Sequence, residues 1–306
     1  MTQYVLKRVL YALFVLWGAL TIIFIAIRIV PGDPAALMLG AGATQEDVET
    51  LQAKLGLDDS MIRQYASFLN DVVHLDFGDS LWLNRPVTQS VTERIAATAK
   101  LAATAMCIAL VVSFPLGILA ALRPRSLIDR LVSVISLVGQ SVPSFWLGIM
   151  LILVFARQLQ WLPSSGSATW QHMILPSITL AMPLIGILTR LIRSGLLDVL
   201  YEDYIRTARS KGLSNRVVLQ RHATRNMLIP VVTVIGLQMG HLLGGAVITE
   251  TVFAWPGIGR LLVDAIFHRD YPLVQASILF ITAGFIFINL LVDLSYVYID
   301  PRIKLK

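Results

Sequence analysis

The chain has 306 residues and a formal net charge of +6 at pH 7; 56% of its residues are hydrophobic and only 14% are charged. Soluble domains have about 45–50% apolar and about 25% charged residues, so this composition excludes a soluble globule, a disordered chain and a coiled coil. The apolar residues form long stretches separated by short charged ones, which predicts an all-α polytopic membrane protein. The lone cysteine, Cys107, excludes a disulfide framework and a cysteine metal site.

Six stretches are long enough to cross a membrane, because a spanning helix needs about 20 mostly apolar residues. The predicted spans are Val9–Val30, Ala96–Leu122, Leu131–Phe155, Ile174–Ile192, Ile229–Thr249 and Leu273–Tyr298. The first exceeds the apolar core of a cleaved signal peptide, about 7–15 residues, and so predicts a retained anchor. Within the third, Ser141–Trp146 (SVPSFW) predicts either a proline-broken helix that lines a pathway or an aromatic anchor.

The segment between the first two spans, residues 31–95, is long and polar. It opens with a turn signal, PGDP, at residues 31–34. Thr44 is predicted to cap a helix that ends at Gly56, and a second amphipathic helix should follow from Ile62 to Val73. These features predict a small helical cap over the outer face, with a solvated linker as the alternative.

The distribution of charge sets the expected orientation. Six spans place both termini on one side, and most of the 25 Lys and Arg residues fall in the segments on that side. Positive charge in short loops marks the cytoplasmic side of a membrane protein. Both termini are therefore predicted to be cytoplasmic. The basic excess is a membrane-topology signal, and no nucleic-acid partner is predicted.

The cytoplasmic segment from Gly195 to Leu228 predicts two short helices separated by a glycine. Gly212 is a natural helix stop, and Ser214 is a natural N-cap for the next helix. A basic loop held by anionic lipid is one interpretation. The glycine-punctuated pair of helices also suits docking into the groove of another protein.

Several motifs occur together and in order along the whole chain. They are PGDPA at 31–35, DFGDS at 76–80, YIRTARSKGLS at 204–214, ETVFAWPGIGR at 250–260, RDYP at 269–272 and NLLVD at 289–293. With these motifs the chain resembles the permease subunits of bacterial ABC importers of the dipeptide, oligopeptide and nickel group. The resemblance implies a type I ABC importer permease fold with six transmembrane helices.

The resemblance also implies a domain organisation and a coupling site. Residues 1–94 would form the first helix and an extracytoplasmic helical segment, 95–293 the permease core with a coupling loop at about 196–228, and 294–306 a short cytoplasmic tail. The loop that docks the ATPase would be Arg206, Thr207, Ala208, Arg209, Ser210, Lys211 and Gly212. The broader family has Glu-Ala-Ala where this chain has Arg206, Thr207 and Ala208, so a contact made by that Glu is not carried over.

The implied partners are a second homologous permease, two ABC ATPase subunits, an extracytoplasmic substrate-binding protein and membrane lipid. The chain itself is predicted not to be an enzyme, because no lysine follows a glycine as a phosphate-binding loop requires. It is expected to bind no cofactor or metal, and ATP-Mg would bind to the partner subunits. His172 and His268 are isolated imidazoles and are not assigned to a metal site.

Polar groups within spans are candidate functional residues because burying them without a partner is costly. The candidates for the pathway or a gate are Gln140, Ser141, Gln238, His241, Glu250 and Asp293. For His241, the alternative role is a hydrogen-bonded contact between two helices. For Glu250 and Asp293, the alternative role is anchoring of a helix at the membrane interface.

The predicted function is ATP-driven import of di- or oligopeptides, glutathione included, at the bacterial inner membrane. Nickel or metal-chelator import by the same architecture is one alternative. A stand-alone secondary transporter or channel is the alternative from a different class.

Overall fold

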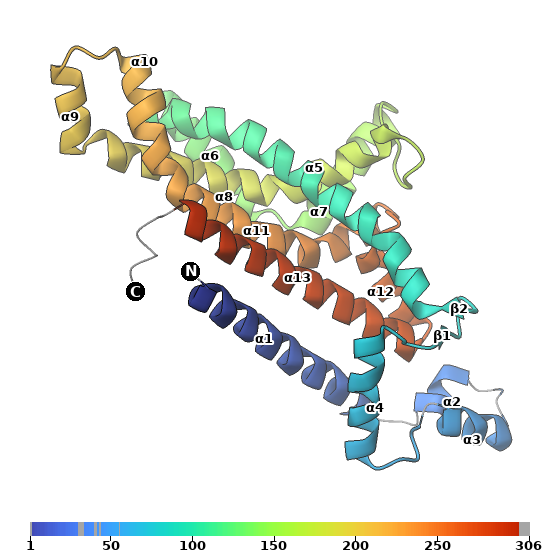
Figure 1. Ribbon diagram of the computed structural model, residues 1–306. Helices are drawn as coiled ribbons and strands as arrows, with labels where there is room; N and C mark the ends of the chain where they lie inside the picture. The colour runs from blue at the N-terminus through green and yellow to red at the C-terminus, as the bar shows by residue number, and fades with distance from the viewer. Residues whose placement is uncertain (1, 30–33, 40–41, 43, 55, 300–306) are drawn as a thin grey trace.

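The computed structural model describes residues 2–29, 34–39, 42, 44–54 and 56–299. Residues 31–33 of the predicted turn at 31–34, and the part of the predicted tail from residue 300, lie outside these residues. The structure is almost entirely helical (Figure 1). In chain order the N-terminal elements are α1 Thr2–Ile29, α2 Pro34–Leu39, α3 Gln45–Lys54, α4 Met61–His74, β1 Asp79–Ser80 and β2 Arg85–Pro86.

The remaining elements form the main bundle and its two end regions. They are α5 Val87–Leu122, α6 Leu127–Ser141, α7 Ser144–Leu151, η1 Ile152–Gln158, η2 Trp170–Met173, α8 Ile174–Leu200, α9 Asp203–Ser210, α10 Asn215–Val217, η3 Val218–Ala223, α11 Thr224–Val252, α12 Ile258–Phe267 and α13 Tyr271–Ile299. By length and composition, four helices qualify as membrane spans within the described residues, and two bent helix pairs bring the number up to 6.

The predicted spans are present, but several of the helices that contain them are longer than the spans, most of all the second and the fourth. The second spanning helix begins at Val87, not at Ala96, and the fourth continues to Leu200, past Ile192. In both cases the helix carries on beyond its apolar stretch, where hydropathy no longer marks it. Figure 1 shows that α5 and α8 run the full length of the bundle.

The third span is broken at a proline, as one of the two interpretations of SVPSFW predicted. Helices α6 and α7–η1 meet at an angle of 101°. Val142 between them has extended backbone angles (φ −74°, ψ 126°), as expected for a residue that precedes proline. The chain therefore turns sharply after Ser141, and α6 and α7 present different faces to the bundle.

Small residues allow the central helices to approach closely. Helix α5 buries Ala102, Ala105 and Ala109 in the core it shares with α8. A Cβ atom added at Gly117 would lie 2.6 Å from Ile192 Cγ2, and one at Gly186 would lie 2.4 Å from the Ser136 carbonyl oxygen. Close backbone approach at small residues is a main source of helix association in membranes. These two glycines thus set the spacing of α8 from α5 and from α6.

The N-terminal segment contains the predicted helices, and we call α2, α3 and α4 together the helical cap. The Thr44 and Asp47 side chains each accept a hydrogen bond from the other's backbone N–H (3.2 and 3.0 Å), so Thr44 caps α3 as expected. Hydrogen bonds from Thr44 hold the pKa of the exposed Asp47 carboxyl below its usual value. Gly56 follows at φ +63°, and α4 covers the predicted amphipathic stretch.

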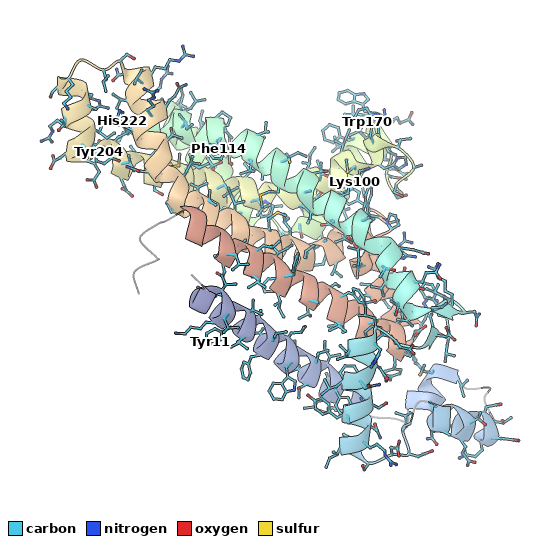
Figure 2. The ribbon with its side chains drawn as sticks, in the orientation of Figure 1. Tyr11, Lys100, Phe114, Trp170, Tyr204 and His222 are labelled. Carbon is cyan, nitrogen blue, oxygen red and sulfur yellow. The ribbon has the colours of Figure 1, made fainter. Side chains whose placement is uncertain are left out.

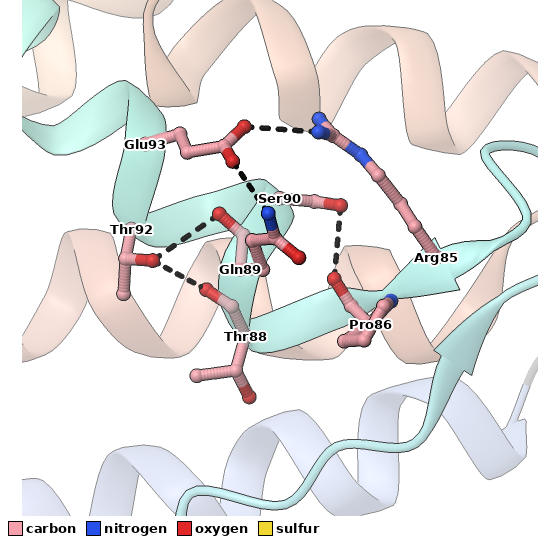
Figure 3. A network of polar contacts seen from close by, with 7 residues as sticks. All are labelled: Arg85, Pro86, Thr88, Gln89, Ser90, Thr92 and Glu93. Carbon is pink, nitrogen blue, oxygen red and sulfur yellow. Dashed lines mark hydrogen bonds and ion pairs between the residues drawn. The ribbon is translucent and has the colours of Figure 1, made fainter.

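A small hairpin links this cap to the bundle. Strands β1 and β2 pair antiparallel, and the buried Asp270 carboxylate accepts hydrogen bonds from Ser80 Oγ (2.6 Å) and from the Trp82 N–H (3.1 Å). Figure 3 shows the polar contacts in the first turns of α5, which follows the hairpin. The Glu93 carboxylate accepts hydrogen bonds from Arg85 Nη1 and from Gln89 Nε2, each at 2.9 Å. Asp270 therefore fixes the hairpin to the beginning of α13.

The two ends of the bundle carry different structures. The start of α1 and the end of α13 lie at the same end as α9 and α10, while α2, α3, α4 and the hairpin lie at the opposite end (Figure 1). Arg8 of α1 forms an ion pair with Asp293 of α13 (2.9 Å), which ties the first helix to the last.

Candidate coupling surface and polar groups of the bundle

The predicted coupling loop is a helical hairpin at one end of the bundle. Helix α9 ends at Ser210, and Gly212 has φ +78°, a left-handed conformation that favours glycine. The Gly212 N–H donates to the Arg209 carbonyl oxygen (2.9 Å), and the Leu213 N–H donates to that of Ala208 (3.3 Å). These bonds close the end of α9 as a helix-terminating glycine does.

The second helix of the hairpin starts where the sequence predicted, although its cap differs. Ser214 has extended backbone angles, φ −62° and ψ 147°, immediately before α10, but its side chain makes no capping hydrogen bond. The turn therefore depends on the conformation of Gly212 more than on Ser214.

One face of α9 is anchored, and the other is exposed. Ile205 and Ala208 are buried in the same core cluster as Val218. Asn226 Nδ2 of α11 donates to the Tyr204 hydroxyl oxygen (2.7 Å), and Figure 2 labels Tyr204 on this hairpin. These contacts tie the hairpin to the core and to α11.

The exposed face carries the rest of the predicted docking residues. They are Arg206, Thr207, Arg209, Ser210 and Lys211, with Gly212 at the turn. Among the residues that the structure describes, Arg206 has only a long ion pair with Asp203 (3.6 Å), and the two side chains are 81% and 94% exposed. Such a pair contributes little to stability. The basic charge of this surface is consequently available to a partner.

Glu250 lies at the centre of a buried cluster that joins three helices. Its Oε1 accepts from Thr98 Oγ1 of α5 (2.6 Å), and its Oε2 accepts from the Arg260 N–H of α12 (3.1 Å). Thr98 Oγ1 in turn accepts from the Ile258 N–H (2.9 Å). We call Thr98, Glu250, Ile258 and Arg260 the Glu250 cluster. It holds α5, α11 and α12 together, which is an anchoring geometry.

The remaining pathway candidates are distributed over several faces. Gln140 and Ser141 are exposed at the end of α6, where Ser141 Oγ bonds its own helix at the Leu137 carbonyl oxygen (2.9 Å). Gln238 is partly buried on α11, and the exposed His241 places its ring edge-on to Phe285 of α13, 6.1 Å between centroids. These residues do not converge on one point within this chain.

Two arginines of α8 were not singled out as site residues from the sequence. Arg190 Nη2 donates to Gln140 Oε1, and Arg193 donates through Nε and Nη2 to Asp129, the second contact measuring 2.8 Å. The signal that could have identified them was their position within the fourth apolar helix, since charges in spans are rarely neutral in function.

The Asp129–Arg193 pair gives the first prediction, which concerns stability. Replacing Asp129 with alanine should lower the free energy of unfolding by about 2–4 kcal/mol, because it leaves the Arg193 charge without its partner. The Asp129 side chain is only 6% exposed and that of Arg193 is 30% exposed. Thermal unfolding of the purified protein in detergent measures the change.

The matched control for this prediction is Asp203→Ala, which breaks the exposed ion pair with Arg206. That variant should change the free energy of unfolding by less than about 1 kcal/mol. Equal melting temperatures for the two variants would contradict a structural role for Asp129.

The comparisons with known proteins decide the family. A family model described as "Binding-protein-dependent transport system inner membrane component" matches residues 113–305, and a model for the N-terminal part of such components matches residues 1–102. The chain belongs to this family. It is the membrane-spanning permease of an ABC importer and not an enzyme, because ATP hydrolysis in these systems is carried out by a separate subunit.

The relatives of this permease include glutathione permeases of two enteric bacteria. "Glutathione transport system permease protein GsiC" of Escherichia coli strain K12 is 43% identical over 306 residues and is matched over 100% of both chains. The protein of the same name from Shigella dysenteriae serotype 1 has the same identity and coverage.

A solved structure shows the same fold. The permease matches a chain of the MetNI methionine ABC transporter, solved in inward-facing conformations, with a TM-score of 0.58 and 17% identity over 69% of this chain and 96% of that one. The prediction of an all-α type I ABC importer permease fold is thereby confirmed. The permease is a multi-pass inner-membrane protein.

Proposed function

We propose that the permease forms half of an ATP-driven pathway that imports glutathione and related short peptides. The observation that carries this proposal is the full-length, 43% identity to glutathione permeases, with no part of either chain left unmatched. The relatives named above favour a peptide cargo over nickel or metal chelators, and we do not propose nickel import.

The proposed orientation has both termini and the α9–α10 hairpin in the cytoplasm. Two observations support it: the start of α1, the end of α13 and the hairpin share one end of the bundle (Figure 1), and that end carries the exposed basic residues of α9. Positive charge marks the cytoplasmic side. The helical cap of α2–α4 would then face the extracytoplasmic side, where a substrate-binding protein delivers cargo.

The proposed assembly pairs this permease with a second homologous permease, two ATPase subunits and the binding protein, within membrane lipid. ATP-Mg would bind to the ATPase subunits only. The exposed residues of α9 and Gly212 would enter a groove on an ATPase subunit, and Arg206, Arg209 and Lys211 would meet acidic groups there.

The anchoring of the hairpin supports a coupling mechanism. Because Ile205 and Ala208 are packed in the core and Tyr204 is bonded to Asn226, the hairpin cannot move independently of α8 and α11. A shift imposed by ATP binding would therefore tilt these helices as a body, and alternating access requires such a two-state motion. Gln140, Ser141, Gln238 and His241 are proposed to line the pathway between the two permeases. Glu250 and Asp293, the two candidate gate residues, are bonded to other helices of this chain, and we propose that they anchor those helices.

The test is transport by the reconstituted complex in proteoliposomes. With its partner subunits, glutathione-loaded binding protein and ATP, the complex should accumulate radiolabelled glutathione, and uptake should stop when ATP is omitted. Uptake by the permease alone without ATP would favour a secondary transporter. Accumulation of nickel and not glutathione under the same conditions would overturn the proposed cargo.

A further inference from the structure

A shallow, largely apolar cavity that carries two arginines lies between α6, α8 and α11. It has a volume of about 430 Å³, and its lining includes Ser133, Arg190, Arg193 and Ser194 beside the apolar Ile187 and Val234. This volume is within the range of about 300–1,000 Å³ that is typical of small-molecule sites. The cavity is wide open to the surface, and its lining comes from three of the predicted spans, where lipid-facing surfaces are normally apolar.

The two arginines of this cavity differ in their charge balance. Arg193 is neutralised by its paired contact with Asp129. Arg190 bonds only the neutral amide of Gln140, and none of the carboxylates in the described part of the chain forms an ion pair with it. A guanidinium has five N–H donors in a planar fork. Arg190, which is exposed, therefore keeps an uncompensated positive charge and has further N–H donors at the cavity.

The surroundings hold Arg190 in place for an incoming anion. Gln140 fixes one edge of the guanidinium from the last turn of α6, next to the break before α7. Ser194 lies one turn further along α8, and its Oγ donates to the Arg190 carbonyl oxygen (3.0 Å). A planar guanidinium held in this way matches the two oxygens of a carboxylate.

We propose that Arg190, positioned by Gln140, binds a carboxylate of the peptide cargo in the cavity between α6, α8 and α11. The inference rests on the proposed peptide import function and adds the residue that recognises the anionic end of the cargo. A lipid phosphate offers similar anionic oxygens, and the experiment separates the two sources.

The experiment measures capture of an anion inside the cavity, in the assembled complex in nanodiscs. Ser194→Cys places a thiol on the cavity wall after the exposed native Cys107 is replaced by alanine. The thiolate attacks glutathione disulfide, forming a mixed disulfide and releasing one glutathione thiolate. The neutral reagent 2-hydroxyethyl disulfide reacts with the same thiolate in the same way. We divide the reaction rate with glutathione disulfide by the rate with the neutral reagent, because changes in thiol reactivity affect both rates and cancel in this ratio.

Arg190→Gln should lower this rate ratio about tenfold, in keeping with the loss of a charge-assisted hydrogen bond. Arg190→Lys should restore part of it, and Gln140→Leu should lower it less than Arg190→Gln does. The matched control is Arg130→Gln, which removes an exposed arginine of α6 that does not line the cavity. That variant should leave the ratio unchanged.

An unchanged ratio in Arg190→Gln would overturn the proposal. A wild-type ratio that equals the Arg190→Gln ratio in nanodiscs containing phosphatidylglycerol, and that rises only when this anionic lipid is omitted, would assign Arg190 to a lipid headgroup and also overturn it. Glutathione uptake by the wild-type complex is measured in parallel. If uptake fails, the proposed cargo is wrong; if uptake succeeds and the ratio does not change, only the role of Arg190 is wrong.

Discussion

Replacing Gly259 with alanine is expected to destabilise the permease so strongly that little folded protein remains in the membrane. A Cβ atom there would lie 2.5 Å from the Val247 Cα and 2.9 Å from Glu250 Oε2. Since the first contact is with backbone, α12 would have to move away from α11 and break the Glu250 cluster. We expect a loss of about 3 kcal/mol or more in the free energy of unfolding. Abundance in the membrane and thermal unfolding in detergent measure the loss.

The matched control is Gly244→Ala in α11, the helix against which α12 packs. Nothing lies within 4 Å of a Cβ atom at Gly244, and alanine is favoured over glycine in a helix by about 1 kcal/mol. This variant should be as abundant as wild type or more so. A Gly259→Ala protein that unfolds at the wild-type temperature would contradict the close packing of α12 on α11.

Replacing Gly212 with valine is expected to uncouple ATP hydrolysis from transport without unfolding the bundle. Gly212 has φ +78°, and no atom lies within 4 Å of an added Cβ, so the penalty is conformational. A side chain in the left-handed region costs about 1–2 kcal/mol per residue, and a β-branched one costs more. The turn should relax to another conformation and misdirect α10. Uptake and cargo-stimulated ATPase activity should fall more than about tenfold, as expected when a contact required for coupling is lost.

Gly212→Asn provides the control, because asparagine tolerates the left-handed conformation better than other residues. It should retain most of the transport activity. Both variants should reach the membrane in wild-type amounts, since the hairpin turn is exposed. Normal coupling in Gly212→Val would mean that the turn does not orient the ATPase contact.

Local signals explain what could be predicted. Long apolar stretches predicted the spans, and a proline after Val142 explains why one interpretation of the third span was a broken helix. Gly212 and Thr44 specify the hairpin turn and the start of α3 through backbone conformation and hydrogen bonds to near neighbours. The predicted ranges for α5 and α8 were shorter than the helices, because hydropathy marks only the apolar residues that cross the membrane and not the polar residues that continue the helix.

The sequence by itself determined that this protein crosses a membrane, where its helices span it and where its coupling hairpin turns, because each depends on residues close together in the chain. Only the tertiary structure decided which polar groups meet. Glu250 bonds Thr98 from 152 positions away, and Gln140 bonds Arg190 from 50 positions away. In a membrane, helices pack through small residues on several faces of similar apolarity. No periodic pattern therefore tells which faces come together, and the function of a buried polar residue becomes clear only when its partner on another helix is known.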